Sequence, residues 1–170
     1  MITPAYIRTM AAYNGEMNRR LYEPASRLSD AERRADRGAF WGSLHGTLAH
    51  ILWADNNWMA RFAGWPKPPG SLKESPLMIG DFNALRDARY DIDARIKAWA
   101  ATIGQDWIDQ PLTWYSASIQ RELTSPRGLL AAHFFNHQTH HRGQAHALLT
   151  AAGVKTEDTD LVIVVPEVVA

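Results

Sequence analysis

Four long stretches of the chain repeat apolar residues at intervals of three and four, and this periodicity restricts the chain to a helical fold. In residues 4–23 the repeat forms one apolar stripe. The stripe consists of Tyr6, Met10, Tyr13, Met17 and Leu21. Similar patterns occupy residues 38–62, 81–102 and 126–153. Helices of this length with an apolar face bury it against one another, so the sequence predicts an all-α four-helix bundle.

Proline and glycine mark the ends of these helices. Residues 64–70 contain three prolines between two glycines and stop the second helix. Ser125-Pro126 is typical of a helix start and opens the fourth helix. Residues 111–123 are rich in β-prone side chains, which predicts a short hairpin before that helix. The apolar tail at 161–165 is compatible with a strand, an arm on a neighbour or packing against the bundle. A length of 170 residues suits a single domain spanning residues 1–170.

The amino-acid composition limits the partners that the protein can bind and the side chains that can hold a metal. Eighteen basic and 18 acidic residues are mixed along the chain, so we expect no nucleic-acid partner. Cysteine is absent, which leaves histidine, carboxylate and amide oxygen as metal ligands. The N-terminus lacks the pattern of a signal peptide, and no apolar run approaches the roughly 20 residues of a membrane span. We therefore expect a soluble, cytoplasmic protein that does not bind membranes.

The segment from Asn136 to Gln144 contains three histidines within five residues. His137 and His141 lie one helical turn apart on one face, so both can bind a single ion. A divalent ion normally needs a third ligand from elsewhere. A helical projection turns both imidazoles toward the bundle interior, where His50 on the second helix also points. Spacing alone leaves a metal ion and ordinary core hydrogen bonding as alternatives, and the third inward imidazole favours the metal.

These motifs resemble those of the DinB/YfiT-like family, whose members are regarded as metal-dependent enzymes. The histidine-rich segment resembles the family signature, and three further segments agree with it. They are Leu48–Asp55 in the second helix, Tyr13-Asn14 with Leu21 in the first helix, and Thr159-Asp160-Leu161 near the C-terminus. The similarity covers most of the chain.

The resemblance implies a four-helix bundle, commonly dimeric, that holds a divalent ion. Matching the motifs assigns His50, His137 and His141 as the metal ligands. Zn²⁺ and Ni²⁺ both suit imidazole. Family members are implicated in reactions that use a low-molecular-weight thiol. We therefore expect a metal-dependent, homodimeric enzyme that activates a thiol or water for thiol transfer to a small molecule or for hydrolysis.

Other polar and aromatic side chains are candidates for the metal surroundings or the substrate pocket. They are His140, Arg142, Gln144, Asn57, Trp53, Tyr13 and Asn14. His140 competes for a place among the ligands, because a pair of histidines three residues apart can also chelate an ion. Arg142 is either an anion anchor or a salt-bridge partner, and Gln144 either binds water or substrate or fills the interior. Gly143 is expected to permit close helix packing.

The sequence assigns no catalytic residue. Asp55 is the one carboxylate in the two histidine motifs, and it is predicted to point away from His50. This favours a nucleophile activated by the metal over a dedicated acid and base. A non-catalytic metal- or ligand-binding stress-response protein is the alternative, and a purely structural bundle with hydrogen-bonded histidines is a third.

Overall fold

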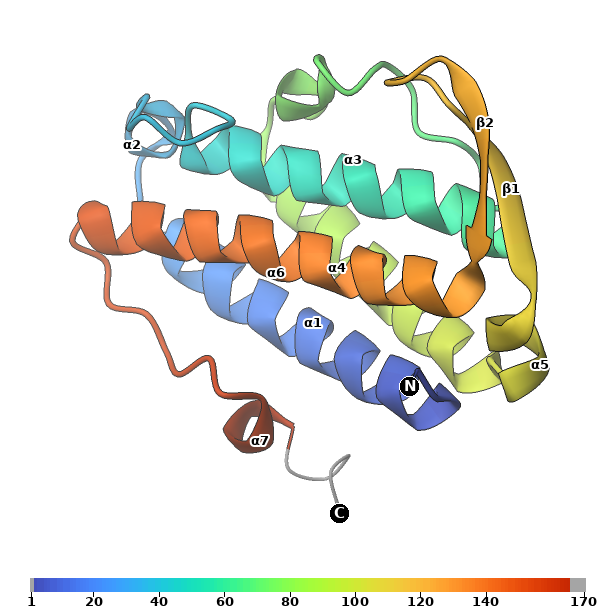
Figure 1. Cartoon of the computed structure of the whole chain (residues 1–170). Coiled ribbons are helices and arrows are strands. Elements are labelled where there is room, and N and C mark those ends of the chain that lie inside the picture. Colours follow the sequence, from blue (N-terminus) through green and yellow to red (C-terminus); the bar gives the residue numbers. More distant parts are fainter. Residues whose placement is uncertain (1, 166–170) are drawn as a thin grey trace.

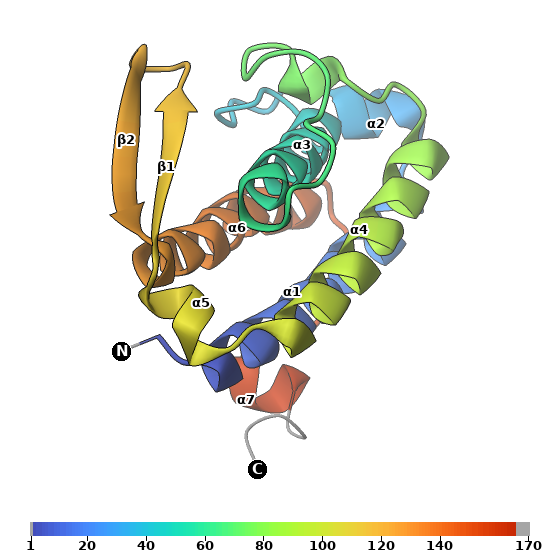
Figure 2. The same cartoon turned by 90° about the vertical axis from the view of Figure 1, so that its right-hand side faces the viewer.

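A computed structural model describes residues 2–165 and shows four long helices. These are α1 (Pro4–Ala25), α3 (Leu44–Ala63), α4 (Phe82–Thr102) and α6 (Arg127–Ala151). Helix α1 packs against α4 and α6, and α3 packs against the same two helices, so the four form a closed ring around one core (Figures 1 and 2). The prediction of an all-α bundle is confirmed. None of the described helices is both long and apolar enough for a membrane span.

Local sequence sets where three of these helices begin. Thr3, Ser43 and Asp81 each adopt an extended backbone and accept a hydrogen bond from the N–H three residues further on. Such caps satisfy donors that the first helical turn leaves without a partner. Helix α6 has no side-chain cap and begins directly after Pro126.

The second predicted helix starts six residues too early, because the apolar run around Phe40 and Trp41 lies in a loop. Gly38 and Gly42 adopt φ angles of 74° and 72°, a left-handed conformation that does not continue a helix. The N–H of Gly42 donates to the carbonyl oxygen of Ala39 at 2.7 Å, which closes a tight turn. The turn places Trp41 beside the first part of α3.

Short elements complete the fold. They are the helices α2 (Asp30–Arg34), η1 (Ser75–Leu77), α5 (Gln105–Asp109) and α7 (Leu161–Val164) and the strands β1 (Pro111–Ser116) and β2 (Arg121–Pro126). The strands pair antiparallel, with Trp114 opposite Leu123, and confirm the predicted hairpin. Because β2 continues through Pro126, the predicted start of the fourth helix is wrong by one residue. The tail forms one helical turn whose Val164 and Val165 pack against Met17, which is the third of the predicted possibilities.

A buried ionic network crosses the core between the helices. The guanidinium of Arg89 on α4 donates to Asp55 on α3 and to Asp93 on α4, each at 2.6 Å. Asn18 on α1 donates its amide to both oxygens of Asp93 at 3.0 Å. Both Arg89 and Asp55 are 0% exposed. The network therefore joins three of the four helices, and Asp93, at 9%, is its most exposed member.

Replacing Arg89 by Met should lower the free energy of unfolding by about 3–5 kcal/mol, because two buried carboxylates then lose their cation. Urea denaturation would measure this loss. Arg95→Met on the same helix is the control, since Arg95 and Asp91 are 45% and 68% exposed and such pairs contribute less than about 1 kcal/mol. Equal losses in the two variants would contradict a special role for the buried network.

Candidate metal centre

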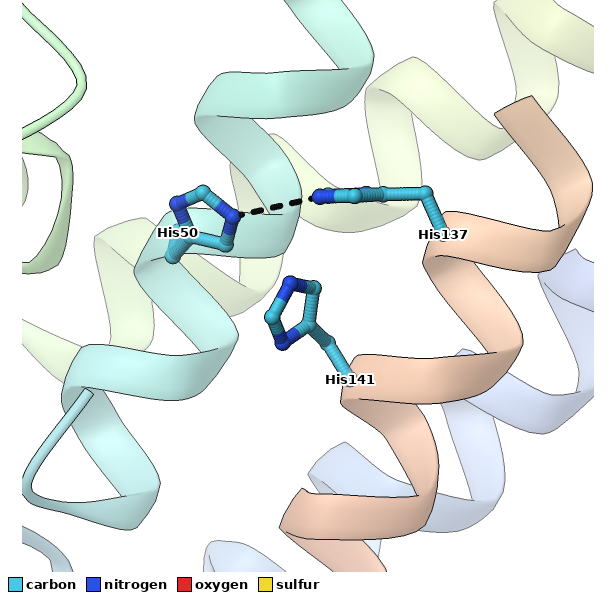
Figure 3. A group of neighbouring side chains, drawn as sticks. All are labelled: His50, His137 and His141. Atoms are coloured by element: carbon cyan, nitrogen blue, oxygen red, sulfur yellow. Dashed lines mark hydrogen bonds between the residues drawn. The ribbon is translucent and has the colours of Figure 1, made fainter. Parts of the chain in front are cut away.

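Three imidazoles from two helices converge on one point. His137 and His141 project from successive turns of α6 toward His50 on α3, as Figure 3 shows. One ring nitrogen of each residue lies within 4.8 Å of the corresponding nitrogens of the other two. The Nε2 atoms of His50 and His137 are 3.4 Å apart. The structure therefore brings together the three residues that the motifs point to, and their spacing lets them hold one metal ion.

The hydrogen bonds of the outer ring nitrogens define the protonation of two of these imidazoles. Ser75 donates its hydroxyl to the carbonyl oxygen of Leu72 at 2.7 Å, so its oxygen accepts the Nδ1 proton of His50 at 2.8 Å. The Nδ1 proton of His141 goes to the amide oxygen of Gln144, also at 2.8 Å. Each ring then presents an unprotonated Nε2. Outer partners of this kind orient histidines that bind metals.

The unprotonated Nε2 atoms of His50 and His141 repel each other unless a hydrogen-bond donor or a cation lies between them. This donor set fits a divalent ion that favours imidazole, such as Zn²⁺ or Ni²⁺. Within the described part of the chain, the group contains three histidines and no carboxylate. A tetrahedral ion held by three protein ligands keeps one position for water or substrate, as in catalytic rather than structural sites.

The electrostatic surroundings keep all three imidazoles neutral. Burial lowers the pKa of His50 to about 3, and the neighbouring His141 and His137 add to the effect. Burial likewise lowers the pKa of His137 to about 4, with a further contribution from His141. The pKa of His141 is also lowered by burial, although the hydrogen bond to Gln144 acts in the opposite direction. Neutral imidazole is the form that binds metals.

Two tryptophans flank His50. The indole of Trp41 stacks on the imidazole with ring centroids 4.0 Å apart and an angle of 25°. Trp53 lies further away, at 6.5 Å and 27°, and donates its N–H to the carbonyl oxygen of Pro69. Next to Trp41, Phe40 is 76% exposed at the tip of the loop. The stacked indole of Trp41 therefore covers one face of the His50 ring.

The remaining candidates divide between this site and the rest of the bundle. His140 is exposed and lies beside His141, with 4.8 Å between ring centroids, while Asn57 is half-buried about two turns beyond His50. Asp55 points away from His50, as expected, and is held by Arg89. Tyr13 on α1 and Arg142 on α6 contact each other, with the guanidinium carbon 5.5 Å from the ring centre, and Asn14 is buried on α1. They are separate from the three histidines.

Sequence reasoning missed Trp41 and Ser75. Trp41 was assigned to a helix, and its position depends on the turn formed by Gly38 and Gly42. Ser75 lies 25 residues from His50 and reaches it through the long connection between α3 and α4. For Trp41 the sequence does contain a signal, because the two glycines that flank the apolar run indicate a turn and not a helix. For Ser75 it contains none.

Replacing Ser75 by Ala should weaken Zn²⁺ or Ni²⁺ binding about 10- to 100-fold, the usual loss when an outer partner of a metal-binding histidine is removed. Isothermal titration calorimetry would measure the affinity. Ser118→Ala in the hairpin turn is the control and should bind as the wild type does. Unchanged affinity in Ser75→Ala would show that Ser75 does not orient His50.

The metal-free protein should become less stable as the pH falls from about 6.5 to about 4. In the unfolded chain, histidine binds a proton near pH 6.5, whereas the folded pKa values of His50 and His137 are about 3 and about 4. Between these pKa values the unfolded state binds more protons than the folded state, so the free energy of unfolding decreases as the pH falls. Urea denaturation across this range tests the sign. His50→Gln, which does not titrate, should show a shallower slope, and an identical slope would refute the assignment.

Of the comparisons with known proteins, the one with protein families gives a match that agrees with this three-histidine geometry. No curated protein and no solved structure shows significant similarity to the chain. A family model described as the DinB family matches residues 1–165. The match includes α3 and α6, which carry the three histidines. The chain therefore belongs to the DinB family.

Proposed function

We propose that the chain is a divalent-metal-dependent enzyme that activates a thiol or water for thiol transfer to a small molecule or for hydrolysis. The observation that carries this proposal is the convergence of three Nε2 atoms, two of them left unprotonated by their hydrogen bonds. The thiol co-substrate, the choice between Zn²⁺ and Ni²⁺ and a homodimeric assembly are parts of the proposal that rest on the family resemblance.

A bound divalent ion would supply a Lewis acid that lowers the pKa of water to ~7 or deprotonates a thiol. The side chains around it have separate tasks. His50, His137 and His141 bind the ion as neutral donors, and Ser75 and Gln144 hold two of these rings in orientation. Trp41 and Trp53 exclude water from one side of His50, which strengthens electrostatic interactions at the site. Substrate would approach from a side that these indoles leave open.

The absence of a dedicated base near the histidines, among the described residues, favours this type of chemistry. Asp55 follows His50 by five residues, but its carboxylate is buried and bound to Arg89. The carboxylate is held toward Arg89 and away from His50, so it is not placed to take a proton from a nucleophile at the histidines. A nucleophile bound to the ion needs no such base, because its proton is acidic enough to pass to solvent.

The absence of a dedicated base near the histidines, among the described residues, also favours a second candidate function. This candidate is a non-catalytic protein that binds a metal or a ligand. Such a protein needs the three histidines and the shielding aromatic rings but no acid or base. It would retain a ligand on the ion without converting it. The two candidates differ in turnover and not in metal content.

Metal analysis of the supplemented protein should find about one divalent ion per chain. His50→Ala, His137→Ala and His141→Ala should each lose most of it, because removal of one of three ligands leaves an incomplete site. His140→Ala is the matched control, an exposed imidazole next to the group, and should keep its metal. Full occupancy in any of the first three variants would contradict the ligand assignment.

Activity assays then separate the two candidates. The metal-loaded protein should conjugate low-molecular-weight thiols to simple electrophiles or hydrolyse simple esters, and His50→Ala should lose this activity. Absence of turnover across such a panel, combined with tight binding of one ligand, would favour the binding protein.

A further inference from the structure

A cavity lies between α6, α1 and the segment that follows α6. It is on the side of α6 that faces away from α3. It has a volume of about 310 Å³. Its walls include Tyr13 and Met17 from α1, Arg142 and Gly143 from α6, and Thr159 from the C-terminal segment. This volume is at the lower end of the range of ~300–1,000 Å³ that is typical of ligand pockets.

Arg142 is a buried cation at this cavity. Its side chain is 4% exposed, and no carboxylate of residues 2–165 lies within ion-pair distance of it. Its guanidinium lies between two other wall residues, because Nη2 donates to the hydroxyl of Thr139 at 3.2 Å and the carbon Cζ is 5.5 Å from the ring centre of Tyr13. Nη1 is buried and has no hydrogen-bond partner among the described residues. Burying a cation in this state is costly unless an anion or water joins it.

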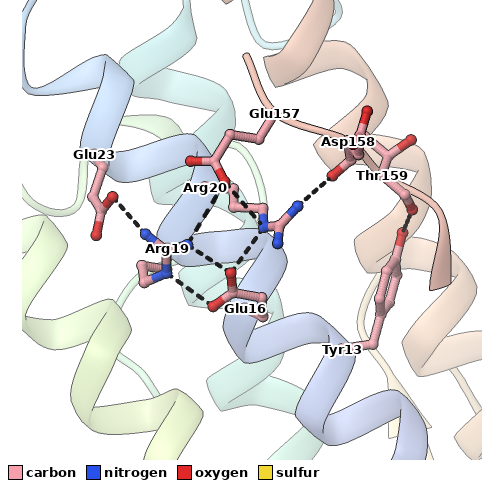
Figure 4. Close-up of polar contacts among 8 residues, drawn as sticks. All are labelled: Tyr13, Glu16, Arg19, Arg20, Glu23, Glu157, Asp158 and Thr159. Carbon is pink, nitrogen blue, oxygen red and sulfur yellow. Dashed lines mark hydrogen bonds and ion pairs between the residues drawn. The ribbon is translucent and has the colours of Figure 1, made fainter. Parts of the chain in front are cut away.

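The segment between α6 and α7 forms a fixed wall of the cavity. The hydroxyl of Tyr13 donates to the carbonyl oxygen of Thr159 at 2.6 Å, and Arg20 donates to that of Asp158 at 2.9 Å. Arg20 also lies 3.5 Å from the carboxylate of Glu157 (Figure 4). These contacts hold the segment on α1 and use its carbonyl oxygens. The carboxylate of Glu157 is directed to the arginines of α1, and the cavity lining itself contains no acidic residue.

Gly143 lines the cavity but is itself exposed. A Cβ atom added at this position would meet no atom within 4 Å among its described neighbours. The expectation that Gly143 permits close helix packing is therefore wrong. The rest of the lining is partly apolar, with Met17 and Leu21 on α1. The cavity thus combines one buried guanidinium with apolar walls.

We propose that this cavity binds a small organic monocarboxylate whose carboxylate pairs with Arg142 and whose apolar body lies against Met17 and Leu21. A guanidinium suits a planar carboxylate, and that of Arg142 has no carboxylate partner among residues 2–165. The apolar walls favour a carboxylate with a hydrocarbon body over inorganic phosphate, which would leave them without contacts. The site is separate from the three histidines, so this proposal does not depend on the proposed enzymatic function.

Benzoate is the probe for this site, and benzamide is its neutral counterpart. Titration calorimetry on the full chain, both metal-loaded and metal-free, should show saturable benzoate binding in both forms. Benzamide should bind about tenfold more weakly or worse, because it lacks the charge-assisted hydrogen bonds. Benzoate binding in the metal-loaded form alone would place it on the ion and overturn the proposal. Binding of phosphate without binding of benzoate would overturn the carboxylate assignment.

Substitution of Gly143 tests the location without removing Arg142. Gly143→Leu should fill the open space and weaken benzoate binding about tenfold or more, whereas Gly143→Ala should leave it unchanged within about twofold. Circular dichroism and Zn²⁺ titration establish that both variants are folded and keep the histidine site. Benzoate binding of wild-type strength in folded Gly143→Leu would refute the proposal. Arg142→Gln, if it folds, should lose the preference for benzoate over benzamide.

Discussion

The ion pairs of the buried Arg89 are the interaction on which the geometry of the bundle depends. They connect α4 to Asp55 on α3, and Asp93 carries the connection on to Asn18 on α1. A buried charge tolerates little displacement of its partners, because a lost hydrogen bond there is not replaced by water. Asp55 lies on the same helix as His50, so the pair restricts rotation of α3 about its axis. The direction in which His50 points toward α6 is thus set partly from the opposite side of its helix.

Much of the fold could be predicted because it depends on local pattern. Apolar periodicity identified all four long helices, and the glycines and prolines after Ala63 identified the end of α3. The same periodicity turned His137 and His141 to the interior, since two residues four apart on a helix share a face wherever that helix lies. The helical projection also turned His50 inward, the resemblance to a family assigned it as their partner on α3, and the structure brings the three together.

The remaining features depend on contacts between distant residues. Ser75 meets His50 only because the connection between α3 and α4 folds back over α3, and nothing in its neighbours along the chain indicates this. Arg142 was expected near the histidines from its motif, but a helix presents several faces, and Arg142 lies on the face of α6 toward Tyr13 on α1. The start of α3 was misplaced because an apolar loop and an apolar helical turn look alike in composition.

The docking of the C-terminal segment on α1 has a consequence for the order of folding and for local opening. Tyr13 and Thr159 are 146 positions apart, and Arg20 and Asp158 are 138 apart, so these contacts close almost the whole chain into a loop. Such contacts form late, after the bundle exists to receive them. They involve few buried apolar groups, so the segment belongs to the least stable part of the fold. Local opening of this segment should therefore cost less free energy than unfolding of the four helices.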